Sequence, residues 1–156
     1  MIKQAETMVR LYEASGLKCA TAESCTGGLA GSMITDVPGS SAIYLGGVVS
    51  YSNSVKERVL NVSGATLAKY GAVSEECAAE MAKGVRLLTG ADVAVSTTGI
   101  AGPGGGSADK PVGLVCFAVS TSAGTRAEKV VFAGSRERIR EQAAVHALGM
   151  LTVAAL

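Results

Sequence analysis

The stretch "TAESCTGGLAGSMITDVPGSS" (residues 21–41) joins a β-type run to a helical run through a turn that carries Ser24, Cys25 and two glycines. Apolar and β-forming residues lead up to Ser24, and a helical pattern follows Gly28 until the Pro38-Gly39 pair ends it. A strand that leads directly into a helix is a unit of α/β folds. We therefore predict a strand over residues 18–24 and a helix over residues 26–36.

The rest of the chain continues this alternation of helices and strands. Helices are predicted over residues 2–15 and 63–70, and after Ser52, Ser74 and Ser135, whose hydroxyls suit N-caps. Strands are predicted at residues 42–52 and 92–99, and residues 113–134 are typical of a hairpin that turns near Ala123-Gly124. The helix after Ser74 has an apolar stripe formed by Ala78, Met81, Ala82, Val85 and Leu88.

This order of elements predicts the fold class. Strand–helix–strand alternation followed by a hairpin indicates an α/β protein, a three-layer α/β/α sandwich with a mostly parallel, mixed five-stranded sheet. The length of 156 residues suits one domain over residues 1–156, and the core must be aliphatic because only 4% of residues are aromatic.

Composition excludes several classes of function. The formal net charge of +1 gives no general attraction to nucleic acid, and the longest apolar runs are too short to span a membrane. The first 16 residues are amphipathic and contain Glu6 and Glu13, which argues against a signal or transit peptide. The four cysteines lack metal-ligand spacing, so we expect free thiols in a reducing cytoplasm, no metal and no cofactor.

Three loops rich in glycine or hydroxyl groups follow the predicted strands, at residues 24–28, 50–54 and 97–107. In sheets of this class, sites gather at the carboxyl ends of parallel strands, so the three loops are expected to meet there. In the first loop, Gly27 and Gly28 leave backbone N–H groups unobstructed beside Ser24 and Thr26, where they suit a developing negative charge. The alternative is that Ser24 or Thr26 only caps the helix.

A reactive serine needs a base. The single histidine, His146, lies among core-type residues of the last helix, and we expect it to be partly buried and satisfied there. A lysine can serve when burial lowers its pKa, which makes Lys56 the candidate, with Tyr51 just before it. The alternative for Lys56 is a solvated helix residue. Cys25 is disfavoured because neighbouring side chains on an extended segment face opposite sides.

The third loop, "TTGIAGPGGGSADKPVG" (residues 97–113), lacks the ending of a P-loop. Its N–H groups suit a phosphate or a ribose, with Thr98, Gly99 and Gly102 as candidate contacts, and the alternative is a flexible lid. Arg136, Arg138 and Arg140 follow in the last helix as candidate anion-binding groups. The alternative is a solvated basic helix face whose charge is balanced by Glu137 and Glu141.

Six blocks in order carry a resemblance to a known family. They are "TAESCTGG" (21–28), "PGSS" (38–41), "VSYSN" with Lys56 (49–56), "GAVSEE" (71–76), "TGIAGPGGG" with "KPVG" (98–113) and "GSRERIREQA" (134–143). Together they resemble the C-terminal domain of the CinA (competence/damage-inducible) family, whose members include nicotinamide mononucleotide amidohydrolases. The blocks span nearly the whole chain.

The resemblance implies an α/β/α domain, often a homodimer, that hydrolyses nicotinamide mononucleotide to nicotinate mononucleotide and ammonia. It implies a serine–lysine pair at Ser24 and Lys56, with Tyr51 assisting, and substrate contacts from Arg136 and Arg140. Many relatives also carry a larger N-terminal domain with a nucleotide pyrophosphatase activity, which we do not expect here. Two other functions stay open: a nucleotide-binding regulatory module without turnover, and an amidohydrolase of another small amide.

Overall fold

The computed structural model describes residues 2–156. Its helices are α1 (Ile2–Ser15), α2 (Leu29–Thr35), α3 (Asn53–Leu60), α4 (Gly64–Tyr70), α5 (Glu75–Thr89) and α6 (Arg136–Ala154). Its strands are β1 (Cys19–Glu23), β2 (Tyr44–Val49), β3 (Val93–Gly99), β4 (Leu114–Thr121) and β5 (Gly124–Val131), and a 3-10 turn, Ser40–Ala42, precedes β2.

The strands form one five-stranded sheet in the order β2-β1-β3-β4-β5. β1 runs parallel to β2 and to β3, whereas β4 is antiparallel to both of its neighbours. β5 therefore runs in the direction of β3, and four of the five strands point the same way. This confirms the predicted mostly parallel, mixed sheet.

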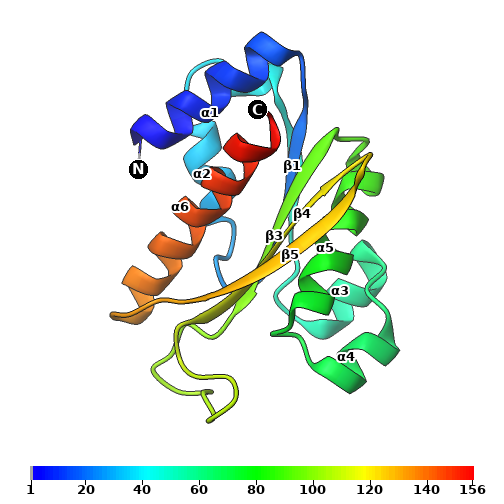
Figure 1. Cartoon of the computed structure of the whole chain (residues 1–156), viewed down its shortest axis with the longest axis vertical. Coiled ribbons are helices and arrows are strands. Elements are labelled where there is room, and N and C mark those ends of the chain that lie inside the picture. The colour runs from blue at the N-terminus through cyan, green and yellow to red at the C-terminus, as the bar shows by residue number, and fades with distance from the viewer. Residues whose placement is uncertain (1) are drawn as a thin grey trace.

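Helices cover both faces of the sheet, which gives the predicted three layers (Figure 1). One face is packed by α1, α2 and α6 around a core that includes Met8, Tyr12 and Phe117. The other face is packed by α3, α4 and α5, with Met81 and Leu60 in its core. The loop after β3 extends beyond the lower end of the sheet as drawn in Figure 1.

The predicted serine caps at Ser52, Ser74 and Ser135 are present, and Ser63 is a fourth cap. The hydroxyls of Ser52, Ser63, Ser74 and Ser135 each accept a backbone N–H from the first turn of α3, α4, α5 and α6, respectively. Each bond satisfies a donor that the helix itself leaves unpaired. The predicted turn between β4 and β5 is also confirmed, because β5 begins at Gly124.

Three predicted details are wrong. The helix after β1 begins at Leu29 and not at residue 26, because Gly27 and Gly28 have positive φ angles of 61° and 100° that a helix does not tolerate. β2 covers Tyr44–Val49, since the residues before it form the 3-10 turn. Leu88, placed on the buried stripe of α5, is 56% exposed, while the other four members of that stripe are buried.

The register aligns the ends of three parallel strands. Glu23, the last residue of β1, pairs with Val49 of β2 and with Thr97 of β3. The segments that follow each of these residues consequently emerge at one edge of the sheet, as the sequence predicts. Among residues 2–156, no helix is both long enough and apolar enough to cross a membrane.

Candidate active site

Ser24 is the first residue after β1, at the edge where the three parallel strands end. Its N–H donates to the carbonyl of Thr97 over 2.9 Å, so it still follows the sheet, and it is 8% exposed. The chain then turns through Gly27 and Gly28, whose left-handed backbone favours glycine. The N–H of Gly27 donates to the carbonyl of Ser24 over 3.1 Å, which closes the turn.

Lys56 points from α3 into this edge of the sheet. The lysine is 1% exposed, and its Nζ lies 3.1 Å from Ser24 Oγ. Nζ also donates to the carbonyl oxygens of Ser50 over 2.8 Å and of Tyr51 over 3.1 Å. The residue is therefore a buried lysine held against the Ser24 hydroxyl, and not a solvated helix residue.

Burial lowers the pKa of Lys56 below its ordinary value of 10.5, because an ammonium loses hydration in this position. No carboxylate counteracts this effect by pairing with the lysine, since the single ion pair found within residues 2–156 joins His146 and Glu128. In the neutral amine, two N–H groups suffice for the carbonyls of Ser50 and Tyr51. The lone pair is then left for the Ser24 hydroxyl, whose proton the amine can accept.

Cys25 lies on the other side of the chain, packed in the core under α2 and α6. It is 7% exposed, and burial raises the pKa of its thiol to about 12. A thiol in that state carries almost no thiolate at neutral pH, so it is a poor nucleophile. All four cysteines are buried free thiols.

Arg136 and Arg140 reach the site loops from the first turns of α6. Arg136 donates to the carbonyl of Gly102 over 2.8 Å and to the hydroxyl of Tyr51 over 3.2 Å. Arg140 donates to the carbonyls of Cys25 and Thr26, each over 3.1 Å. They share a helix face because they are four residues apart, whereas Arg138 faces away and lines the groove between α6 and β5.

The remaining candidates are placed differently. The Tyr51 side chain is 62% exposed, and its hydroxyl contacts Arg136, not Ser24 or Lys56. Thr98 is buried with its hydroxyl bonded to the carbonyl of Ala72, on the α5 side of the sheet. Gly99 is packed against the backbone of β4, where a Cβ would lie 2.7 Å from the carbonyl oxygen of Leu114.

Within the turn, the side chain of Thr26 is fully buried and points inward. Its hydroxyl bonds to Glu23 Oε1 and to the hydroxyl of Thr97, both at 2.7 Å. Within residues 2–156, the backbone N–H groups of Thr26 and Gly28 donate to no acceptor. The Thr26 side chain thus stabilises the turn, while two backbone N–H groups of the turn have no acceptor among the described residues.

Sequence reasoning missed Glu23, Thr97 and Ser50. Glu23 is 2% exposed and anchors the start of α2, Thr97 accepts from Ser24, and Ser50 holds Lys56 through its carbonyl. A signal existed for Glu23, because it is an acidic residue that ends a strand without any other charge. Thr97 and Ser50 act through their backbone carbonyls. Every residue has such a carbonyl, so their residue types gave no signal of these contacts.

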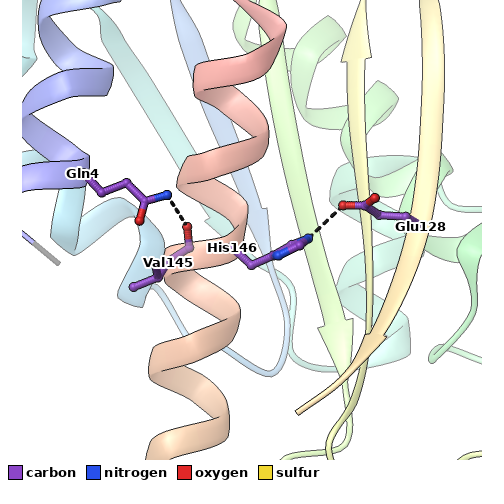
Figure 2. A network of polar contacts seen from close by, with 4 residues as sticks. All are labelled: Gln4, Glu128, Val145 and His146. Atoms are coloured by element: carbon purple, nitrogen blue, oxygen red, sulfur yellow. Dashed lines mark hydrogen bonds and ion pairs between the residues drawn. The ribbon is translucent and has the colours of Figure 1, made fainter.

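His146 belongs to a different region of the protein. Figure 2 shows it projecting from α6 toward Glu128 of β5, and its Nε2 lies 2.8 Å from the glutamate Oε1. Its ring also packs on Phe117, with centroids 4.5 Å apart. The prediction of a partly buried, satisfied histidine is confirmed. No group of three or more His, Cys, Asp or Glu side chains within residues 2–156 is arranged to hold a metal ion.

The fold and the site define an α/β/α domain with a buried serine–lysine contact at the carboxyl edge of its parallel strands. The model of the CinA C-terminal domain family matches residues 2–154. The chain therefore belongs to the CinA family, as its sequence blocks suggest, and it matches the C-terminal domain of that family.

Individual relatives agree with this assignment. A CinA-like protein of Desulfotalea psychrophila is 54% identical over 136 residues, which are 87% of this chain and 33% of the relative. A CinA-like protein of Geobacter sulfurreducens is 51% identical over 144 residues, which are 92% of this chain and 35% of the relative. The chain thus spans about a third of the length of these curated relatives.

A solved structure shares the fold. The competence/damage inducible protein CihA from Agrobacterium tumefaciens superposes with a TM-score of 0.95 at 41% identity, covering 99% of this chain and 94% of that one. A CinA superfamily protein from Escherichia coli superposes with a TM-score of 0.93 at 34% identity, covering 98% of this chain and 90% of that one.

Proposed function

We propose that this protein hydrolyses the carboxamide of nicotinamide mononucleotide, with Ser24 as nucleophile and Lys56 as base. The observation that carries the proposal is the 3.1 Å contact between Ser24 Oγ and the Nζ of a lysine that is buried and has no acidic partner within residues 2–156. A serine beside a neutral amine is an activated nucleophile. The family resemblance supplies the substrate.

In the proposed reaction, Ser24 Oγ attacks the carboxamide carbon while its proton passes to Lys56 Nζ. The negative charge on the carbonyl oxygen is stabilised by the N–H groups of Thr26 and Gly28. Lys56 then returns the proton to the leaving nitrogen, ammonia departs, and an ester with Ser24 remains. Water activated by Lys56 cleaves this ester, which releases the carboxylic acid and restores the serine.

The charges around the site support an anionic substrate. Arg136 and Arg140 lie near the turn, and neither forms an ion pair within residues 2–156. Arg136 and Arg140 use some of their N–H groups on backbone carbonyls, and a guanidinium has five. We assign the remaining donors, with backbone groups near Gly99 and Gly102, to the phosphate and ribose. We assign to Tyr51, which is exposed at the rim with its hydroxyl on Arg136, the orientation of the pyridine ring.

The test is ammonia release from nicotinamide mononucleotide, nicotinamide riboside, free nicotinamide and glutamine, with Ser24→Ala as the blank. We expect the mononucleotide to have by far the highest kcat/KM, because binding of the remote phosphate orients the amide. Binding of the mononucleotide without ammonia release would indicate a regulatory module instead. Preference for a different amide would replace the substrate but keep the serine–lysine chemistry.

A further inference from the structure

We infer that Glu23 is a positioning residue for the nucleophile: its buried carboxylate holds the turn that carries Ser24 in its reactive shape. This inference rests on the proposed function of Ser24. Glu23 directly precedes the serine and is 2% exposed, and within residues 2–156 it has no cationic partner. A buried carboxylate is costly unless its oxygens accept hydrogen bonds, so its partners indicate its role.

All partners of the carboxylate belong to the turn or to the helix that follows it. Oε1 accepts the Thr26 hydroxyl over 2.7 Å and the N–H of Ala30 over 2.9 Å. Oε2 accepts the N–H of Gly31 over 3.0 Å. One side chain thereby ties the end of β1 to the middle of the turn and to the first residues of α2.

Close packing keeps this arrangement in place. A Cβ on Gly31 would lie 2.6 Å from Tyr44 Oη and 3.4 Å from Glu23 Oε2, so the glycine lets the helix approach the carboxylate. Thr26 is held from two directions, because Glu23 and Thr97 bind its hydroxyl while Arg140 binds its carbonyl. The peptide planes on either side of Thr26 are therefore fixed, and one of them carries the Thr26 N–H, one of the two proposed oxyanion donors.

Glu23 also connects the two members of the reactive pair through its main chain. Its carbonyl accepts the N–H of Ser50 over 2.8 Å, and the carbonyl of Ser50 accepts Lys56 Nζ over 2.8 Å. A shift of Glu23 would move Ser24 directly and Lys56 through Ser50. Because misplacement of a reacting group by about 1 Å can cost on the order of 10²-fold in rate, this residue should control reactivity without contacting substrate.

The experiment measures the labelling of Ser24 by a fluorophosphonate, which needs no natural substrate. Ser24 Oγ forms a bond to phosphorus, fluoride leaves, and the serine proton passes to Lys56. Glu23→Gln keeps the shape of the side chain but places an amide N–H against one of the N–H or O–H donors. We expect labelling to slow on the order of 10²-fold. For amide hydrolysis we expect kcat to fall while KM stays unchanged.

Matched variants separate positioning from general stability. Thr26→Val removes the hydroxyl and should slow labelling. Thr26→Ser keeps the hydroxyl and should be labelled at close to the wild-type rate. Tyr12→Phe is the control, because it deletes a buried hydrogen bond of similar length, from Tyr12 Oη of α1 to the carbonyl of Leu151 of α6 over 2.8 Å, that involves no residue of the turn. It should lower the melting temperature without slowing labelling.

The outcomes distinguish the two proposals. Wild-type labelling that Ser24→Ala abolishes but Glu23→Gln leaves at full rate overturns the positioning role alone. Failure of the wild type to label at Ser24 overturns the proposed function, and the positioning role with it. If Glu23→Gln does not fold, equal labelling of Thr26→Val and Thr26→Ser overturns the inference.

Discussion

The protonation of Lys56 determines whether Ser24 has a base. An ordinary lysine is almost fully protonated at neutral pH, and here burial without an acidic partner lowers the pKa. In the same position the two N–H groups of the neutral amine face the Ser50 and Tyr51 carbonyls, and the lone pair is left for the Ser24 hydroxyl. At this scale the site depends on one amine being both desolvated and oriented.

Lys56→Arg should lose on the order of 10²–10⁴ in kcat, the usual scale for a general base, because a guanidinium keeps its proton at accessible pH. Lys56→Met should lose as much, which separates a base from an electrostatic anchor. Steady-state ammonia release measures both, with the exposed Lys83→Arg as the matched control. Wild-type kcat/KM should rise with pH through one ionisation below the ordinary lysine pKa. High activity of Lys56→Arg would contradict the assignment.

Ser24→Ala should abolish turnover, while Cys25→Ala should keep most of it. The reason is that burial in the apolar core holds the Cys25 thiol protonated, with a pKa of about 12, whereas the Ser24 hydroxyl contacts Lys56 Nζ. Ammonia release and thermal unfolding together check the pair. An inactive Cys25→Ala protein with a normal melting temperature would move the nucleophile from the hydroxyl to the thiol.

At the scale of elements, α6 brings charge to a site built by the sheet. Its first turns place Arg136 and Arg140 over the loops after β1 and β3, while Arg138, on the opposite face, lines a separate groove. Helical geometry explains the division, because a two-residue step rotates a side chain by about 200°. The alternating arginines therefore do not form one basic patch.

Arg136→Ala should raise KM for nicotinamide mononucleotide about tenfold or more and leave KM for nicotinamide riboside nearly unchanged. A charge-assisted bond to phosphate is worth about 1.5–3 kcal/mol, and the riboside has no phosphate. Arg138→Ala on the same helix is the control and should change neither value. Equal effects of the Arg136 and Arg138 variants would mean that only the general field of α6 matters.

For the whole molecule, Lys56 links folding to pH. Its folded pKa is depressed, so between that value and the ordinary 10.5 the unfolded chain binds one more proton than the folded protein. The contribution of Lys56 to the free energy of unfolding is consequently most unfavourable at low pH. It improves as pH rises through the folded pKa and stops changing above the unfolded one.

The free energy of unfolding of the wild type should therefore rise relative to that of Lys56→Met as pH increases from 7 toward 10. Urea unfolding of both proteins at several pH values measures the difference, in which the titrations of all other groups cancel. A difference that stays constant with pH would show that Lys56 has the same pKa in the folded and unfolded states.

The sequence alone determined features that depend on neighbours along the chain. Apolar periodicity predicted the helix over residues 2–15, where α1 lies, and the hydroxyls of Ser52, Ser74 and Ser135 predicted the starts of three helices. A cap bonds an N–H only two or three residues away, so local residue types suffice to predict it. Strand–helix alternation likewise predicted the layers and the edge where the site lies.

Only the tertiary structure decided what meets at that edge. Ser24 and Lys56 are 32 positions apart, and their contact depends on the register that sets Glu23 beside Val49 and Thr97. The burial of Lys56, the exposure of Leu88 and the anchoring by Glu23 follow from the same packing. No local pattern encodes these features, because the hydrogen bonds and desolvation that cause them come from segments distant in sequence.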